Sequence, residues 1–218
     1  MMTTTSAAIS FWSVLSLVGS MAVMGPAGVF VGAWLALGKH TRLAMNWVLL
    51  FGAGMVVVVL TKLAFMGWGV GIASISFAGF SGHAMRASAV LPVLFYLLFK
   101  HLRPSNVGVG VALGALLAVL ITVSRLELGA HPISEAMGGS LLGFGIAWLF
   151  IRQAHKLQEF RIHPVLAGLG LCGLLMAPHV EPVPTEELIE RAALILSGHD
   201  HTFSRYDFMT TEQRILPQ

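Results

Sequence analysis

Polar residues that could carry out chemistry stand next to long apolar runs at two places in the chain. The first is "FSGHAMRA", where Ser81, Gly82, His83 and Arg86 precede an apolar stretch. Ser81 can cap a helix, and backbone N–H groups near Gly82 can approach an anion because glycine has no side chain. His83 would lie beside that anion as an acid, and Arg86 follows about one helical turn later. The alternative is an ordinary serine cap with a histidine at the membrane interface.

The second place is "SRLELGAHPISEAMGG", residues 124–139. Pro132 is expected at the first position of a helix, which puts His131 at the helix N-terminus and Glu135 four residues later on the same face. A carboxylate there can hold one imidazole nitrogen and leave the other free, which orients a nucleophilic histidine and stabilises its charge during reaction. The alternative is that His131 and Glu135 only cap the helix.

The composition indicates the environment in which these residues must work. The chain is 56% hydrophobic and 11% charged, whereas soluble domains carry about 25% charged residues. The apolar runs are long and repeated, which favours an integral membrane protein over an apolar soluble core. No Lys or Arg precedes the first run, so the N-terminus lacks the basic region of a cleaved signal peptide. The net charge of +3 is too small and scattered to indicate a nucleic-acid partner.

We therefore expect an all-α fold, a polytopic six-helix transmembrane bundle with a short N-terminal interfacial segment and a C-terminal tail. The membrane domain would cover 8–180, the interfacial segment 10–18 and the tail 181–218, which begins with a short amphipathic helix. Each span is near the ~20 residues that cross about 30 Å of hydrocarbon. The expected spans are 20–38, 45–67, 84–101, 106–125, 132–152 and 163–180.

Basic residues fall into alternate connections between the expected spans. The positive-inside rule makes that side of the membrane cytoplasmic, so the other connections and the tail face outward. The residues are Lys39 and Arg42, Lys100 and Arg103, and Arg152, Lys156 and Arg161.

Three further cations, Lys62, Arg86 and Arg125, fall at the outward ends of expected spans. Ionisable residues at membrane depth are costly, and they indicate a functional site unless they only extend to the lipid interface. The convergence of three cations with His83 and His131 favours an anion site, with phosphate as the first candidate.

Glycine spacing inside the expected spans indicates close helix packing. Gly110 with Gly114, and Gly139 with Gly143, have the GxxxG spacing that lets helix backbones approach one another.

Together these residues resemble the type 2 phosphatidic acid phosphatase family of membrane lipid phosphatases, which is similar to vanadium haloperoxidases in its catalytic core. The family pattern has three parts: Lys, six residues and Arg-Pro; Pro-Ser-Gly-His; and Ser-Arg, five residues, His, three residues and Asp. Ser124, Arg125 and His131 reproduce the third part with its spacing. "FSGH" at 80–83 reproduces most of the second part, and Lys62 stands where the first begins.

Three positions depart from the family pattern. Gly69 and Val70 stand where Arg-Pro is expected, Phe80 replaces a proline, and Glu135 replaces the final aspartate. Glutamate keeps the carboxylate with a reach one methylene longer. The missing arginine removes a phosphate ligand, and Arg86 is our candidate for supplying its charge.

The resemblance implies a lipid phosphatase in a bacterial cytoplasmic membrane, with its site facing the periplasm or exterior. His131 would attack phosphorus and form a phosphohistidine, Glu135 would orient it, and His83 would protonate the leaving oxygen. No metal or other cofactor is expected. The expected phosphate-binding residues are Lys62, Ser81, Gly82, Arg86, Ser124 and Arg125.

The expected substrate is a lipid phosphate or diphosphate in the bilayer, and a polyprenyl diphosphate such as undecaprenyl diphosphate is the first choice on family precedent. A phosphatidyl phosphate or a lipid A phosphate would also fit. Two alternatives remain open: a non-catalytic protein that binds or transports a lipid phosphate, and a lipid phosphotransferase.

Overall fold

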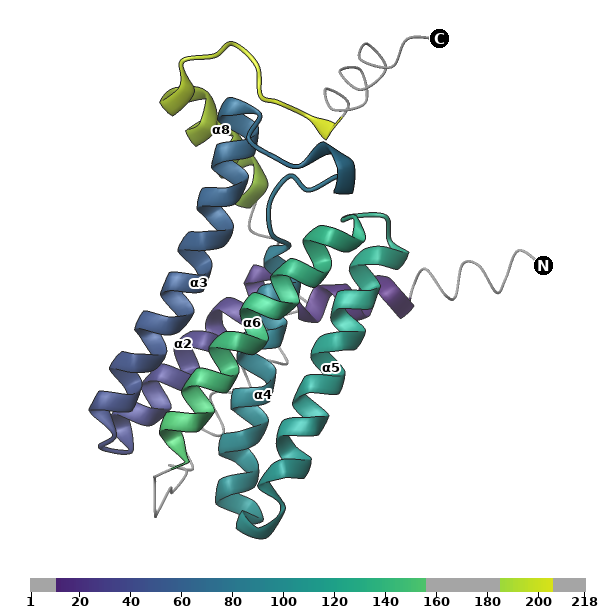
Figure 1. The fold of residues 1–218 in the computed structure, drawn as a ribbon. Helices are drawn as coiled ribbons and strands as arrows, with labels where there is room; N and C mark the ends of the chain where they lie inside the picture. The colour runs from purple at the N-terminus through teal and green to yellow at the C-terminus, as the bar shows by residue number, and fades with distance from the viewer. Residues whose placement is uncertain (1–10, 156–184, 206–218) are drawn as a thin grey trace, which may run out of the picture.

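A computed structural model describes residues 11–155 and 185–205 of the chain, and the regular elements among them are helices (Figure 1). One isolated bridge joins Ile72 and Phe77. The elements in order are α2 (Met21–Leu37), α3 (Thr41–Trp68), η1 (Ala73–Ile75), α4 (Gly82–Leu102), η2 (Pro104–Asn106), α5 (Val107–Glu127), α6 (Ile133–Ala154) and α8 (Thr185–Ser197).

The described helices confirm the all-helical membrane fold. Five of them are long and apolar enough to cross a membrane. They agree with the first five expected spans to within a few residues, except that the first begins earlier, while the expected sixth span at 163–180 lies outside the described residues. The five are Phe11–Leu37, Thr41–Trp68, Gly82–Leu102, Pro104–Glu127 and Ile133–Ala154.

Helix α4 lies at the centre of the described bundle. In its most apolar stretch 72% of the residues are buried, against 17% in the corresponding stretch of α3. Its neighbours α2, α3, α5 and α6 all contact it. The outer helices expose apolar side chains such as Val56, Leu116 and Leu141, as expected for surfaces that face lipid. Groups at the N-terminus of α4 are therefore held from several sides.

Glycines bring α5 and α6 into backbone contact with α4, as their spacing predicted. A Cβ atom on Gly114 would lie 2.6 Å from the carbonyl oxygen of Leu91, and one on Gly139 would lie 2.5 Å from that of Ser81. A Cβ on Gly143 would collide with the carbonyl oxygen of Met85. Both GxxxG pairs thus set how closely their helices approach α4.

The two ends of the bundle carry different residues. Figure 1 shows the α2–α3 turn, the α4–α5 connection and the end of α6 together at one end. The described basic residues that we assigned to the cytoplasm lie there. The connection 69–81, the α5–α6 connection and α8 lie at the other end. The polar sequence motifs are therefore brought to the end opposite the basic loops.

The connection between α3 and α4 is shaped by two glycines with positive φ. Gly69 ends α3 in the left-handed conformation, with φ 68°. Gly79 has φ 128°, and a Cβ there would lie 3.1 Å from the backbone nitrogen of Lys62. The connection therefore passes directly against α3 at Lys62, which only a residue without a side chain allows.

Residues 11–18, which were expected to lie at the interface, form a helical segment that turns into α2 at Gly19 and Ser20. Figure 1 shows this segment lying crosswise to α5. Phe11 and Val14 are exposed, whereas Ser16 is buried. The segment therefore places one polar side chain inside the bundle.

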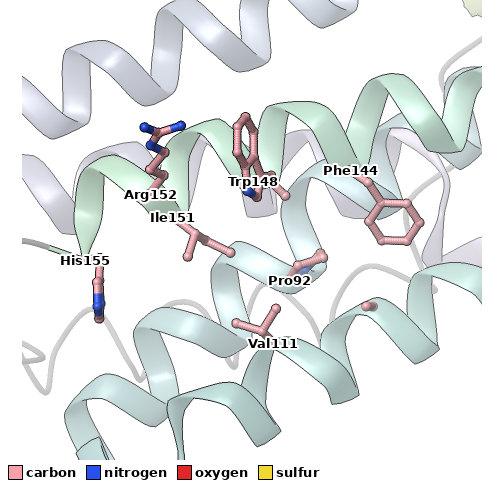
Figure 2. A pocket seen from close by; sticks show the side chains of 9 residues that line it. Pro92, Val111, Phe144, Trp148, Ile151, Arg152 and His155 are labelled. Atoms are coloured by element: carbon pink, nitrogen blue, oxygen red, sulfur yellow. The ribbon is translucent and has the colours of Figure 1, made fainter.

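A groove of about 460 Å³ lies at the basic end, between α4, α5 and α6 (Figure 2). It is lined mainly by apolar side chains, with Arg152 and His155 toward the end of α6. The Arg152 guanidinium lies 5.5 Å from the centre of the Trp148 ring. The groove is separate from the polar motifs at the other end.

Candidate active site

His131 and Glu135 meet at the start of α6. Pro132 is the residue before the helix, with φ −69° and ψ 163°, and Ile133 is its first residue, so the helix begins one position later than predicted. The His131 Nδ1 atom lies 2.6 Å from Oε2 of Glu135, and both side chains are buried. Nε2 of His131 is the ring nitrogen that this contact leaves for chemistry.

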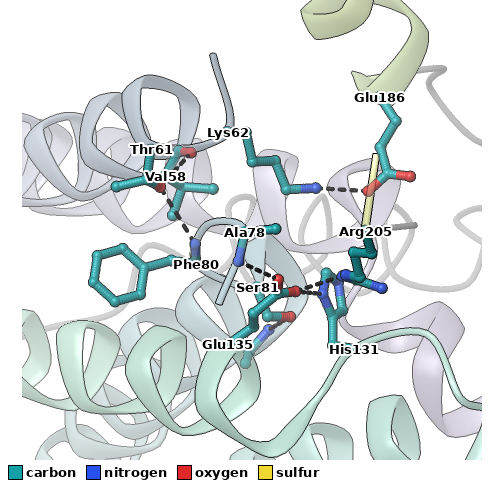
Figure 3. Close-up of polar contacts among 11 residues, drawn as sticks. Val58, Thr61, Lys62, Ala78, Phe80, Ser81, His131, Glu135, Glu186 and Arg205 are labelled. Carbon is teal, nitrogen blue, oxygen red and sulfur yellow. Dashed lines mark hydrogen bonds and ion pairs between the residues drawn. The ribbon is translucent and has the colours of Figure 1, made fainter. Parts of the chain in front are cut away.

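Glu135 collects three side-chain hydrogen bonds although it is only 1% exposed (Figure 3). Its Oε1 accepts from the Ala78 backbone N–H at 2.8 Å, and its Oε2 accepts from Arg205 at 2.7 Å as well as from His131. Its own carbonyl oxygen accepts from the Ser81 N–H at 3.1 Å. A buried carboxylate is costly unless it is paired in this way. Glu135 therefore links the 69–81 connection to α6 by two hydrogen bonds.

The N-terminus of α4 begins beside this pair. Ser81 is fully buried, and its hydroxyl accepts a hydrogen bond from the Ala84 N–H at 3.5 Å, so it caps the helix as predicted. Gly82 follows as the first helical residue. His83, the next residue, is half-buried. The charges of Arg125, Arg86, His131 and Lys62 all act on it, so the two candidate catalytic histidines share one polar cluster.

Two arginines of the cluster have unused donors. Arg86 is 5% exposed, its Nε is buried without a partner among the described residues, and its Nη1 would lie 2.8 Å from a Cβ atom on Gly82. Arg125 donates from Nη1 to the Ser16 hydroxyl at 2.6 Å, and its Nε is buried without a partner among the described residues. Buried donors without acceptors cost about 1–3 kcal/mol each. The arrangement favours an added anion with several acceptor oxygens.

Lys62 faces a carboxylate from the far end of the chain. Its Nζ lies 2.6 Å from Oε1 of Glu186, and the two side chains are 12% and 68% exposed (Figure 3). The charge and hydrogen bond of Lys62 hold the pKa of the Glu186 carboxyl below its usual value, and the charges of His131 and Arg125 act in the same direction. Glu186 therefore lies in the positive field of the candidate site.

The structure brings most of the predicted residues to one end of the bundle, with one exception in role. The Ser124 hydroxyl donates to the carbonyl oxygen of Ile121 at 2.6 Å and is fully buried. In this structure Ser124 serves its own helix rather than the polar cluster.

Three groups were missed by sequence reasoning: the Ala78 N–H, Glu186 and Arg205. Glu186 is 124 positions from Lys62, and Arg205 is 70 positions from Glu135. No spacing rule links residues this far apart. Within the described ranges, no three His, Cys, Asp or Glu side chains form a group that could hold a metal ion.

Comparisons with known proteins give a family match over the same part of the chain. A family model described as "PAP2 superfamily" matches residues 60–159, which include the Lys62, Ser81–His83 and Arg125–Glu135 regions. The chain is 33% identical over 203 residues to an uncharacterized 22.5 kDa protein in the cps region of Klebsiella pneumoniae, covering 90% of this chain and 96% of that one.

Two further matches carry a functional description. Over 88 residues the chain is 35% identical to phosphatidylglycerophosphatase B of Bacillus subtilis (strain 168), covering 39% of this chain and 43% of that protein. The fold is similar to the crystal structure of a transmembrane PAP2 type phosphatidylglycerolphosphate phosphatase from Bacillus subtilis, with a TM-score of 0.54 and 26% identity over 70% of this chain and 79% of that one. These matches agree with the membrane helices and with the order of the motifs along the sequence, and the chain belongs to the PAP2 superfamily.

Proposed function

We propose that the protein is a membrane lipid phosphatase that works through a phosphohistidine intermediate. The observation that carries the proposal is the buried His131–Glu135 pair, 2.6 Å apart, beside cations that include Arg86, whose Nε has no partner among the described residues. The pair orients a nucleophile, and the cations supply the positive charge that a transferring phosphoryl group needs.

The proposed first step forms a bond between Nε2 of His131 and phosphorus while the bond from phosphorus to the leaving oxygen breaks. Protonated His83 gives its proton to that oxygen. Glu135 stabilises the positive charge that develops on His131. In the second step water attacks phosphorus, loses a proton to His83 and releases inorganic phosphate, which restores His131.

The phosphoryl oxygens would bind among Lys62, Arg86 and Arg125, with the Ser81 hydroxyl and the Gly82 backbone N–H at the N-terminus of α4 beside them. The Ser81 N–H is already taken by the Glu135 carbonyl oxygen. Ser124 would act through Arg125, its neighbour on α5, because its hydroxyl is bound to Ile121. These cations would stabilise the equatorial oxygens in the transition state, where such preorganised charge has its largest effect.

The proposed substrate carries its phosphate at the headgroup level of the outer leaflet of a bacterial cytoplasmic membrane. A polyprenyl diphosphate is our first choice. The Bacillus subtilis proteins are named for phosphatidylglycerophosphate, so that lipid is the second. The membrane domain would cover 8–180, and the tail at 181–218 would lie outside, at the same end as the site.

The decisive experiment measures inorganic phosphate released by purified protein from undecaprenyl diphosphate, phosphatidylglycerophosphate, phosphatidic acid and a lipid A phosphate. Wild type should hydrolyse at least one lipid, and His131→Ala should hydrolyse none. An acid-labile, base-stable phosphoryl group should be trapped on wild type during turnover. Phosphate release by His131→Ala at the wild-type rate would refute the mechanism. Lipid binding without release would favour a binding or transport protein, and transfer to an added acceptor would favour a phosphotransferase.

A further inference from the structure

The C-terminal segment brings an arginine to the proposed nucleophile. Nη2 of Arg205 lies 2.7 Å from Oε2 of Glu135, the same oxygen that lies 2.6 Å from Nδ1 of His131 (Figure 3). The guanidinium and the imidazole are therefore joined through one carboxylate atom. No residue near Arg205 in the sequence belongs to the family pattern.

Several contacts hold this segment against the end of α3. The Phe203 N–H donates to the carbonyl oxygen of Met66 at 2.9 Å. Nδ1 of His199 lies 2.9 Å from the carbonyl oxygen of Gly67. The Phe203 ring would lie 3.0 Å from a Cβ atom on Gly69. Arg205 thus follows directly after an anchored stretch of chain.

Gly69, against which Phe203 packs, is also the position of the missing arginine. Gly69 is where the family pattern places its first arginine, seven residues after Lys62, and Gly69 has φ 68°. A side chain there would be strained and would meet Phe203. Phe203 of the C-terminal segment therefore covers position 69, which lacks the arginine. Another arginine, Arg205, follows Phe203 by two residues.

The Arg205 side chain stays partly exposed while it contacts the buried Glu135. Its side chain is 44% exposed, whereas that of Glu135 is 2% exposed. A guanidinium has five N–H donors, and within the described residues the contact with Glu135 uses one of its terminal nitrogens. The planar fork of the remaining donors suits two phosphate oxygens at once.

We propose that Arg205 is a phosphate-binding residue of the active site, supplied by the C-terminal segment in place of the arginine absent at position 69. The proposal rests on the proposed phosphatase function and adds a residue outside the family motifs. One edge of the guanidinium stays on Glu135, and the other binds the phosphate or diphosphate of the lipid.

The test compares purified full-length wild type with Arg205→Ala, Arg205→Lys and Arg191→Ala. Arg191 is an exposed arginine of α8 and serves as the matched control. Sodium orthovanadate binding is measured by calorimetry, together with KM and kcat on the best lipid substrate. Arg205→Ala should weaken vanadate binding and raise KM by about 10- to 100-fold. Arg205→Lys should recover part of both losses, and Arg191→Ala should match wild type.

Three results would overturn the proposal. One is unchanged vanadate affinity and KM in Arg205→Ala. Another is a fall in kcat alone, which would make Arg205 a positioning residue for Glu135. The third is a gain in activity, which would show that the segment blocks the site.

If wild type binds vanadate but releases no phosphate from any lipid, the phosphatase function fails, while the vanadate data still decide the role of Arg205. If Arg205→Ala does not fold, Arg205→Lys against wild type decides it.

Discussion

Glu135 and Glu186 each hold a basic group of the proposed site, but in opposite ways. The Glu135 side chain is 2% exposed and joins His131, Arg205 and the Ala78 N–H. The Glu186 side chain is 68% exposed and forms an ion pair with Lys62. Removing one partner of a buried pair costs about 3–5 kcal/mol, whereas an exposed pair contributes about 0.2–1 kcal/mol.

This difference divides the site into a fixed side and an exchangeable side. The side built by α4, α6 and the 69–81 connection keeps the proposed nucleophile in place. On the side built by α3 and α8, an arriving phosphate can take the place of Glu186 at Lys62 for a small cost. A site needs both, because the nucleophile must be preorganised and the ligand must still enter.

The largest effect should come from the fixed side. His131→Ala removes the proposed nucleophile and should lower phosphate release by at least about four orders of magnitude. His155→Ala, beside the groove at the basic end, is the matched control and should keep wild-type turnover. Equal losses of activity in both variants would mean that the assay reports whether the protein is folded rather than what His131 does.

Glu135→Gln should lower kcat by about 10²- to 10⁴-fold, because an amide cannot stabilise a positive imidazolium as a carboxylate does. Glu135→Asp keeps the charge found in the family pattern and should retain more activity. Both are measured as steady-state phosphate release, together with the thermal unfolding midpoint. If Glu135→Gln kept wild-type kcat, the buried carboxylate would have only a structural role.

Arg86→Ala tests the buried guanidinium at Gly82. Losing a charge-assisted hydrogen bond to phosphate should raise KM about 10- to 100-fold. Arg152→Ala at the opposite end, where the side chain stacks on Trp148, should leave KM unchanged. Identical kinetics for Arg86→Ala and wild type would remove Arg86 from the site.

The smallest effect should come from the exchangeable side. Lys62 lowers the pKa of Glu186 when the tail is docked, so docking is favoured where Glu186 is ionised and loses that contribution as pH falls through the lowered pKa. At neutral pH, Glu186→Gln should speed hydrogen exchange of residues 198–205 by no more than about five-fold. The difference between the variant and wild type should vanish below the lowered pKa. A difference that persists there would mean that the ion pair does not hold the tail.

Local patterns predicted the cap of α4 and the His131–Glu135 pair, whereas distant contacts determine the rest of the site. Ser81 capping α4, and His131 with Glu135 on one helical face, follow from spacings of a few residues. The direction of the Arg86 side chain and the docking of Phe203 on Gly69 depend on tertiary packing. An amphipathic pattern in the tail predicts a surface helix, but not which surface it covers.

The direct contact of Gly139 with the Ser81 carbonyl oxygen has a mechanical consequence. Two backbones in contact cannot be pressed closer, since protein interiors are already close-packed. The close approach at Gly139 therefore sets a lower limit on the distance between the start of α4, which carries His83, and the first turns of α6, next to His131. A glycine that lets two helices approach thus also fixes how near the two proposed reacting groups can come.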